Sequence, residues 1–148
     1  MSSQLQRFLS LPVSDRRLLM RSVALIGAAR AALWVLPFNI ARRLLVRPGR
    51  PRSAPFATTE RIGWAISIGK RFVPKGNCLP QALAAESLLV RAGHPVELRV
   101  GVAKSANGWL EAHAWVESRG RLVVGDLTQG LSTYTPLPAL PPLHTPQG

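Results

Sequence analysis

The sequence predicts an α+β fold in which a helical N-terminal part precedes an antiparallel sheet. Apolar residues recur at helical spacing along residues 15–36 and again along residues 78–92. Apolar and polar residues then alternate with a period of two along residues 96–102 and 110–117, the pattern of half-buried strands. With 148 residues, 47% of them hydrophobic, the chain can bury one core but is too short for two ordinary domains.

The first helix is predicted to begin at Ser14, whose side chain can cap it, with Asp15 suiting the positive helix end. The apolar stretch 22–41 has the length of a membrane span, but Arg30 near its middle and Pro37 argue against one. A signal peptide is not expected either, because the apolar run starts late and more arginines follow it. We predict a helix that is buried or that contacts a membrane surface.

Two further helices are expected before the sheet. Residues 38–46 form a short one, which leads into a Pro/Gly/Arg-rich linker at residues 47–55. Thr58 or Thr59 can then cap a helix over residues 60–72. The tryptophans of the chain outside the predicted site, Trp34, Trp64 and Trp109, are expected to be packing residues.

The segment KGNCLPQAL places Cys78, the single cysteine, at the start of a helix that runs to Gly93. Pro80 suits the first turn, because its missing N–H would have no helical partner there. Gly93 suits a left-handed helix end. Asn77 is expected to cap this helix, and its side chain is also a candidate for an oxyanion hole. A single cysteine is most often a buried structural residue. Cys78 is therefore interpreted as a nucleophile only if a general base and an orienting group lie near it.

Such partners are predicted by the strand register. If residues 119–120 (Arg-Gly) form a two-residue turn, the strands 110–117 and 121–126 pair as a hairpin. His113 then lies directly opposite Asp126, close enough for a carboxylate to accept a hydrogen bond from the imidazole. Arg-Gly is a weaker turn signal than Asn-Gly, and a bulge would break this register.

Cysteine, histidine and aspartate in this arrangement suit acyl chemistry. The Cys78 thiolate attacks a carbonyl, the His113 imidazole takes and returns the proton, and the Asp126 carboxylate orients the ring. A helix N-terminus favours the thiolate, and its N–H groups can receive an oxyanion. Glu111 shares a strand face with His113 and is the rival orienting group. Trp115 shares that face too and is expected to pack beside His113, with a substrate wall as its alternative role.

The chain is strongly basic, and its charge is uneven. The net charge is +12, and residues 1–60 carry ten arginines against two carboxylates, whereas residues 61–148 carry nine Lys or Arg against five. Such a field suits nucleic acid, an anionic membrane surface or an acidic partner. No nucleic-acid-reading motif is recognisable and only 6% of residues are aromatic, so nucleic acid is not expected as a partner.

Cysteine usage indicates a reducing compartment. One cysteine cannot form an internal disulfide, and no C-x-x-C pair or His/Cys cluster offers metal ligands. We expect a cytoplasmic protein with neither metal nor cofactor, and contact with a membrane surface is the alternative.

The segment CLPQALAAESLLVRAGHPVELRVGV, followed by EAHAWVE and GD, resembles the leader peptidase of lasso-peptide biosynthesis. The resemblance is to the stand-alone peptidase half of the split B protein, within the transglutaminase-like, papain-related cysteine protease superfamily. It covers residues 60–127 well, and the Leu/Arg-rich beginning is similar but less specific. The set of fragments is specific, whereas each fragment alone is weak.

This resemblance implies a core in which the nucleophile helix packs on an antiparallel sheet. It implies a cysteine protease that cuts the leader from a ribosomal precursor peptide, with Cys78 as nucleophile, His113 as general base and Asp126 as the orienting carboxylate. It also implies two partners, a small protein that recognises the leader and an asparagine-synthetase-like lasso cyclase that uses ATP. No nucleotide-binding loop is visible in this chain.

The predicted organisation has three parts. Residues 1–55 form a basic helical region, residues 56–130 the peptidase core, and residues 131–148 a Pro-rich, irregular tail. Two other functions stay open at this level. One is acyl transfer to an amine, as in transglutaminases, and the other is a basic nucleic-acid or membrane-surface binding module with an inert Cys78.

Overall fold

The computed structural model describes residues 2–49, 56–73, 78–104, 106–125 and 135–136. Its helices are α1 (Ser2–Ser10), α2 (Val13–Val35), α3 (Phe38–Leu45), α4 (Thr59–Gly69) and α5 (Cys78–Ala92), with a 3-10 turn η1 (Lys70–Phe72) after α4. Its strands are β1 (Glu97–Lys104), β2 (Leu110–Ser118), β3 (Arg121–Val124) and β4 (Thr135–Pro136). The predicted α+β class, with helices first and an antiparallel sheet after them, is confirmed.

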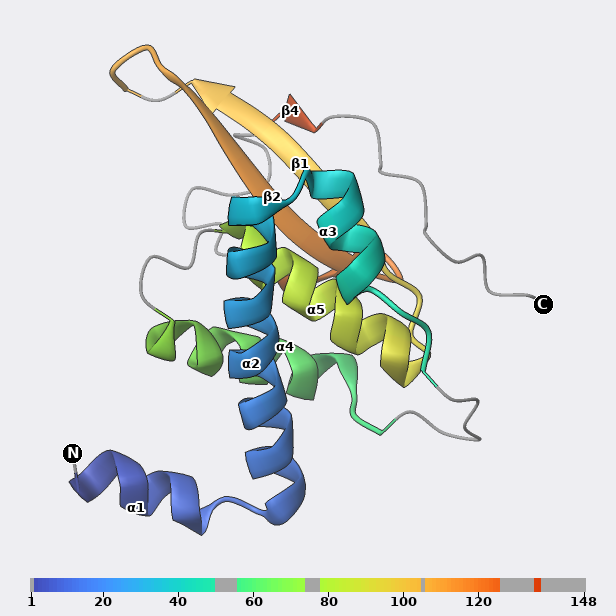
Figure 1. The fold of residues 1–148 in the computed structure, drawn as a ribbon. Coiled ribbons are helices and arrows are strands. Elements are labelled where there is room, and N and C mark those ends of the chain that lie inside the picture. The colour runs from blue at the N-terminus through green and yellow to red at the C-terminus, as the bar shows by residue number, and fades with distance from the viewer. Residues whose placement is uncertain (1, 50–55, 74–77, 105, 126–134, 137–148) are drawn as a thin grey trace.

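Helix α5 lies at the centre of the molecule, between the sheet and the other helices (Figure 1). The sheet has the order β3-β2-β1-β4, and all of its described pairs are antiparallel. One side of α5 packs on the sheet, and α2 and α4 cover the other side. The core joins all of these layers, and its fully buried side chains include Ile26, Ile62, Ile66, Leu83, Leu88, Leu89, Leu98 and Val116.

Helix α2 begins one residue earlier than the predicted cap. Its N-cap is Pro12, no side chain caps it, and Ser14 lies inside the first turn, so the prediction that Ser14 caps this helix is wrong. Proline suits this place because its φ is already close to the helical value. The helix ends at Val35, and Pro37, the N-cap of α3, prevents its continuation.

Length and composition alone would let α2 cross a membrane, and it is the one described helix of which this is true. The core helices of soluble proteins share these properties, and the side chains of Leu18, Ile26 and Ala29 are indeed part of the buried core. The core therefore extends across the compositional boundary expected near residue 55.

A buried ion pair fastens α3 to α5. The Arg42 guanidinium donates from Nε to both carboxylate oxygens of Glu86 at 3.1 Å, and from Nη2 to Oε1 at 2.5 Å. The side chains are only 6% and 3% exposed. Beside them, the Ser87 hydroxyl donates to the Leu45 carbonyl at 2.8 Å. These polar contacts add to the apolar packing of Phe38, Ala41 and Leu45 in holding this short helix on the core.

Helix α4 is capped as predicted. Its N-cap is Thr58, whose hydroxyl accepts a hydrogen bond from the backbone N–H of Arg61 at 3.2 Å. The backbone N–H of Glu60 and the Thr59 hydroxyl hold the pKa of the exposed Glu60 carboxyl below its usual value. The Arg61 side chain pairs with Asp15 of α2, which ties the two helices together at the surface.

The hairpin between β2 and β3 has the predicted turn. Arg119 and Gly120 both have positive φ, at 51° and 76°, as a two-residue turn of the primed type requires. The pairs along the hairpin are Ser118 with Arg121, Glu117 with Leu122, and Val116 with Val124.

A bulge between Val116 and Glu117 shifts the register of this hairpin by one residue. The first two pairs keep the predicted register, and the third does not. The expectation of an unbroken register as far as His113 is therefore wrong. Asp126 itself lies outside the described residues, so its position relative to His113 stays a prediction.

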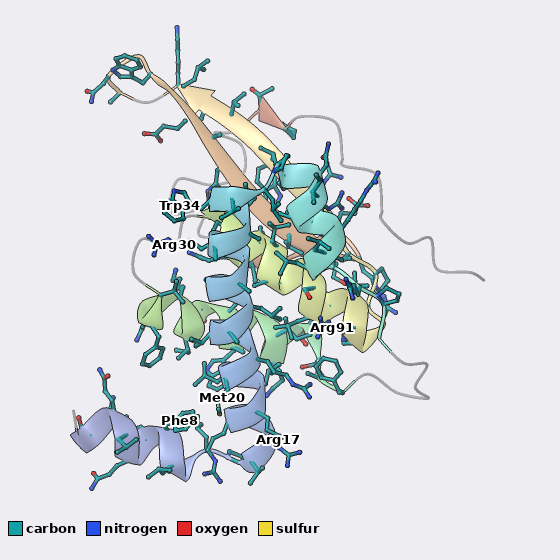
Figure 2. The ribbon with its side chains drawn as sticks, viewed as in Figure 1. Phe8, Arg17, Met20, Arg30, Trp34 and Arg91 are labelled. Carbon is teal, nitrogen blue, oxygen red and sulfur yellow. The ribbon has the colours of Figure 1, made fainter. Side chains whose placement is uncertain are left out.

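Two tryptophans expected to pack are exposed. Trp34, near the end of α2, is 90% exposed, and Trp109, at the tip of the β1–β2 hairpin, is 76% exposed. Figure 2 shows Trp34 and Arg30 extending from the same side of α2. The sequence pattern also did not predict α1, which projects away from the body and exposes Leu5 and Leu9 (Figure 1).

Candidate functional site

Cys78 is the first residue of α5. Its side chain is half-buried, and Pro80, two residues later, is buried in the first turn. The N-terminus of a helix carries partial positive charge, which favours an anion such as a thiolate. The helix end at Gly93 is also as predicted, because Gly93 has a φ of 87°. Asn77, the predicted cap and oxyanion candidate, lies outside the described residues.

Strand β2 brings a hydrogen bond and a histidine to this thiol. The backbone N–H of Ala114 donates to Cys78 Sγ at 3.4 Å. His113 is the residue before Ala114 and is half-buried. The described pairing of β3 with β2 ends at Val116, two residues from Ala114. The thiol therefore lies beside β2 just beyond the bulge.

Cys78 and His113 line the same small pocket, of about 160 Å³. Its lining comes from four parts of the fold, namely η1, α5, β2 and the end of β3. The lining residues are Lys70, Cys78, Gln81, His113, Ala114, Val124 and Gly125. The single cysteine and the strand histidine therefore line one pocket in the described part of the chain, although they lie 35 positions apart in the sequence.

Trp115 supports the histidine from one side. The rings of His113 and Trp115 are stacked, with centroids 6.3 Å apart and planes inclined by 22°. Trp115 is only 2% exposed, and its indole N–H donates to a Glu117 carboxylate oxygen at 2.9 Å. The stacking limits the freedom of the imidazole to turn, and the hydrogen bond to Glu117 holds the indole in place. The packing role expected of Trp115 describes this arrangement, and Trp115 is not among the residues that line the pocket.

Two features require a glycine at position 125, directly after β3: its backbone conformation and the close approach of Trp115. Its φ is 143°, a conformation that residues with a side chain rarely adopt. A Cβ atom at this position would lie 2.6 Å from the Cβ of Trp115. Gly125 also lines the pocket, so the chain passes Cys78 and His113 immediately before it reaches Asp126. Asp126 is not described, and its role as orienting carboxylate stays a prediction.

The other candidates lie elsewhere or serve the fold. The ring of His94 bonds to the Ala57 carbonyl at 2.7 Å and so links the α5–β1 turn to the segment before α4. Glu111, the rival orienting group, is exposed on β2. Among the described residues, no group of three or more His, Cys, Asp or Glu side chains could hold a metal ion.

Three contributors to the pocket were missed by sequence reasoning. Gln81 is only partly exposed and lines the pocket, and its helical spacing of three from Cys78 could have indicated this. Lys70 arrives from η1, for which no sequence signal exists. The Ala114 N–H belongs to the backbone and is invisible to any residue pattern.

This arrangement can carry out nucleophilic acyl chemistry. A thiol at a helix start, with a backbone donor to its sulfur and an imidazole in the same pocket, has the parts that a cysteine nucleophile and its general base need. No part of this chemistry calls for a cofactor.

Comparison with known proteins gave one match. A family model described as the transglutaminase-like superfamily matches residues 22–139, which include α2 from Ser22 onward, the described elements from α3 to β4 and the whole pocket. No curated protein and no solved structure matches the chain.

Proposed function

The chain belongs to the transglutaminase-like superfamily, and from this membership we propose that it is a cysteine peptidase. The observation that carries the proposal is the position of Cys78, at the start of α5 and in one pocket with His113. A structural cysteine would need neither the histidine nor the access to solvent. The superfamily holds enzymes that act through this type of nucleophile.

The reaction proceeds through a thioester. The Cys78 sulfur attacks the carbonyl carbon of the scissile bond, and His113 holds the thiol proton and passes it to the amine that leaves. His113 then takes a proton from water, and the resulting hydroxide attacks the thioester. The carboxylic acid leaves, and the thiol is regenerated with that proton. The backbone N–H groups at the start of α5 stabilise the oxyanion in both steps.

The substrate we propose is the precursor of a lasso peptide, cut between leader and core. This finer proposal rests on the resemblance of the segments around Cys78, His113 and Gly125 to the stand-alone lasso leader peptidases. From the same resemblance come the partners, a small leader-recognition protein and an asparagine-synthetase-like cyclase that closes the freed core. The lone free cysteine fits the reducing cytoplasm in which ribosomal precursors are made.

The basic surface of α2 supports docking of an acidic partner. Arg17 and Arg21 lie one turn apart on α2 and line a surface pocket of about 350 Å³, together with the Arg61–Asp15 pair. Arginine clusters bind carboxylates with directed, charge-assisted hydrogen bonds. We propose that this surface receives the recognition protein or acidic residues of the leader.

Acyl transfer to an amine is the second candidate, because the matched superfamily is named for that reaction. It uses the same thioester and differs only in the acceptor, an amine in place of water. The two functions are separated by the mass of the product, since hydrolysis adds water to the leader and transfer adds the amine.

The test is cleavage of the precursor by the whole chain in the presence of its recognition protein, followed by mass spectrometry. The wild-type chain should release a leader that ends in a free acid, and Cys78→Ala should release none while its circular dichroism spectrum is unchanged. Processing by Cys78→Ala at the normal rate would falsify the proposal. A leader that carries an added amine would instead show that the enzyme catalyses acyl transfer.

A further inference from the structure

A second and larger hollow begins next to the nucleophile, and we name it the α2–α5 groove. It measures about 660 Å³, and its lining is mostly apolar. The lining residues are Gly27, Arg30, Ala31, Leu33, Trp34, Val73, Leu79 and Pro80. The groove thus lies between the C-terminal half of α2 and the first turn of α5.

One face of α2 forms the wall of this groove. Gly27, Arg30, Ala31 and Trp34 occupy positions i, i+3, i+4 and i+7 of the helix, so they share one side of it. Gly27 and Ala31 are small and leave room beside the larger side chains of Arg30 and Trp34. A Cβ atom at Gly27 would meet nothing within 4 Å, so the space above this glycine is open.

The opposite wall is continuous with the candidate active site. Leu79 and Pro80 line the groove and directly follow Cys78 in the first turn of α5. At the other end, η1 links the two hollows, since Lys70 lines the catalytic pocket and Val73, just after η1, lines the groove. The groove and the catalytic pocket are therefore lined by neighbouring residues of the same two segments, η1 with its end and the first turn of α5.

We propose that the α2–α5 groove binds an apolar side chain of the peptide that Cys78 cleaves. This inference rests on the proposed function and adds to it the class of residue that the enzyme selects beside the scissile bond. Burial in the groove removes the peptide side chain and the 90% exposed Trp34 from water together.

Gly27 offers a clean way to fill the groove. Gly27→Leu extends a side chain into the open space, and leucine and alanine both favour a helix more than glycine does, so neither substitution should lower stability. Gly27→Ala is the matched control, because it adds the same Cβ but leaves most of the groove open. Trp34→Ala removes a wall, and Trp109→Ala is its control, an exposed tryptophan on the distant tip of the β1–β2 hairpin.

The experiment uses a pool of synthetic decapeptides with randomised residues, and the cleaved bonds are identified by mass spectrometry. The wild-type chain should favour leucine, isoleucine, valine or phenylalanine at one fixed distance from the cut. Gly27→Leu should lower kcat/KM for these peptides by about 10- to 100-fold and shift the preference to glycine and alanine. Trp34→Ala should weaken the preference, whereas Gly27→Ala and Trp109→Ala should keep it.

A second measurement separates the groove from the chemistry. The Cys78→Ala chain, which cannot cleave, is immobilised and incubated with the same peptide pool. Enrichment of apolar peptides that disappears in the Cys78→Ala, Gly27→Leu double variant supports the groove even if the wild-type chain cleaves nothing. The proposal is overturned if the pool shows no apolar preference in either measurement, or if Gly27→Leu leaves the preference as it was.

Discussion

The Arg42 guanidinium and the Glu86 carboxylate form a buried ion pair that joins α3 to α5. Glu86 lies in the middle of the helix that begins at Cys78, two turns from the thiol. Burial of two charges is costly, and it is tolerated only when each charge is matched by its partner. The pair therefore makes the position of α3 a condition for a stable α5.

Arg42→Met should be strongly destabilising, because it leaves the Glu86 carboxylate buried without its counter-ion. We expect the free energy of unfolding in urea to fall by about 3–5 kcal/mol. The second change, Glu86→Leu, should recover most of this loss, since a buried pair replaced by apolar side chains is often neutral. Glu97→Gln is the control, because its pair with Arg99 is exposed and worth less than about 1 kcal/mol. A double variant as unstable as Arg42→Met would contradict this account.

His113→Ala should abolish cleavage without loss of the fold. As the general base, His113 is expected to contribute about 10³-fold or more to kcat, and its removal leaves the thiol unassisted. The matched control is His94→Ala, which loses the bond to the Ala57 carbonyl and should cost about 1 kcal/mol of stability but no kcat. Cleavage rates and urea unfolding of both variants provide the measurement. Equal losses of kcat would show that His113 has no special role.

Asp126→Asn should lower kcat by about 10- to 10³-fold, less than the change at Cys78. An asparagine keeps the size of the side chain but no longer stabilises the imidazolium that forms during the reaction. Glu111→Gln, a substitution of the exposed rival carboxylate on β2, should leave the rate unchanged. If Glu111→Gln lowered kcat more than Asp126→Asn, Glu111 rather than Asp126 would be the orienting group.

Gly125→Ala should damage both the fold and the reaction. The new Cβ would approach the Cβ of Trp115 to 2.6 Å, and the φ of 143° adds strain, so we expect a loss of about 2 kcal/mol or more. Because Trp115 stacks on His113, kcat should fall as well. Gly93→Ala has a positive φ but open space around it, so it should cost about 1–2 kcal/mol with an unchanged kcat. A fully active Gly125→Ala enzyme would show that the position of Trp115 does not affect catalysis.

Deletion of residues 2–11 should spare the fold and weaken docking. Helix α1 contributes no residue to the described core, whereas α2 does, so deletion as far as residue 55 should instead prevent folding. We expect the short deletion to change the free energy of unfolding by less than about 1 kcal/mol and to raise the KM for precursor presented by the recognition protein. An unchanged KM would assign docking to the arginines of α2 alone.

Local patterns predicted much of this fold. Helical spacing and the Pro and Gly signals located the helix from Cys78 to Ala92, and alternation located the strand that carries His113. The Arg-Gly turn between the two alternating segments was also anticipated, although from a weak turn signal, and the structure pairs Ser118 with Arg121 across it. Each of these features depends on residues that are neighbours in sequence.

The position of the bulge was not predicted, and the bulged residue packs against a segment that is distant in the sequence. Its extra residue is Val123, whose carbonyl oxygen would be 2.7 Å from a Cβ at Gly63 of α4. Only the absent side chain of Gly63 allows β3 to approach so closely. The exposure of Trp34 was not predicted either. A tryptophan beside an open groove and a tryptophan inside a core have the same sequence pattern.

The donor to the Cys78 sulfur has a consequence for how this site can change over time. Because the donor is the main-chain N–H of residue 114, no ordinary exchange of that side chain can remove it, and only proline would. A single substitution at Cys78 or His113 therefore removes the nucleophile or the base. The Ala114 N–H is lost only when strand β2 itself is disrupted. Inactive descendants of this protein should accordingly keep a thiol-sized niche beside β2 long after the catalytic side chains are gone.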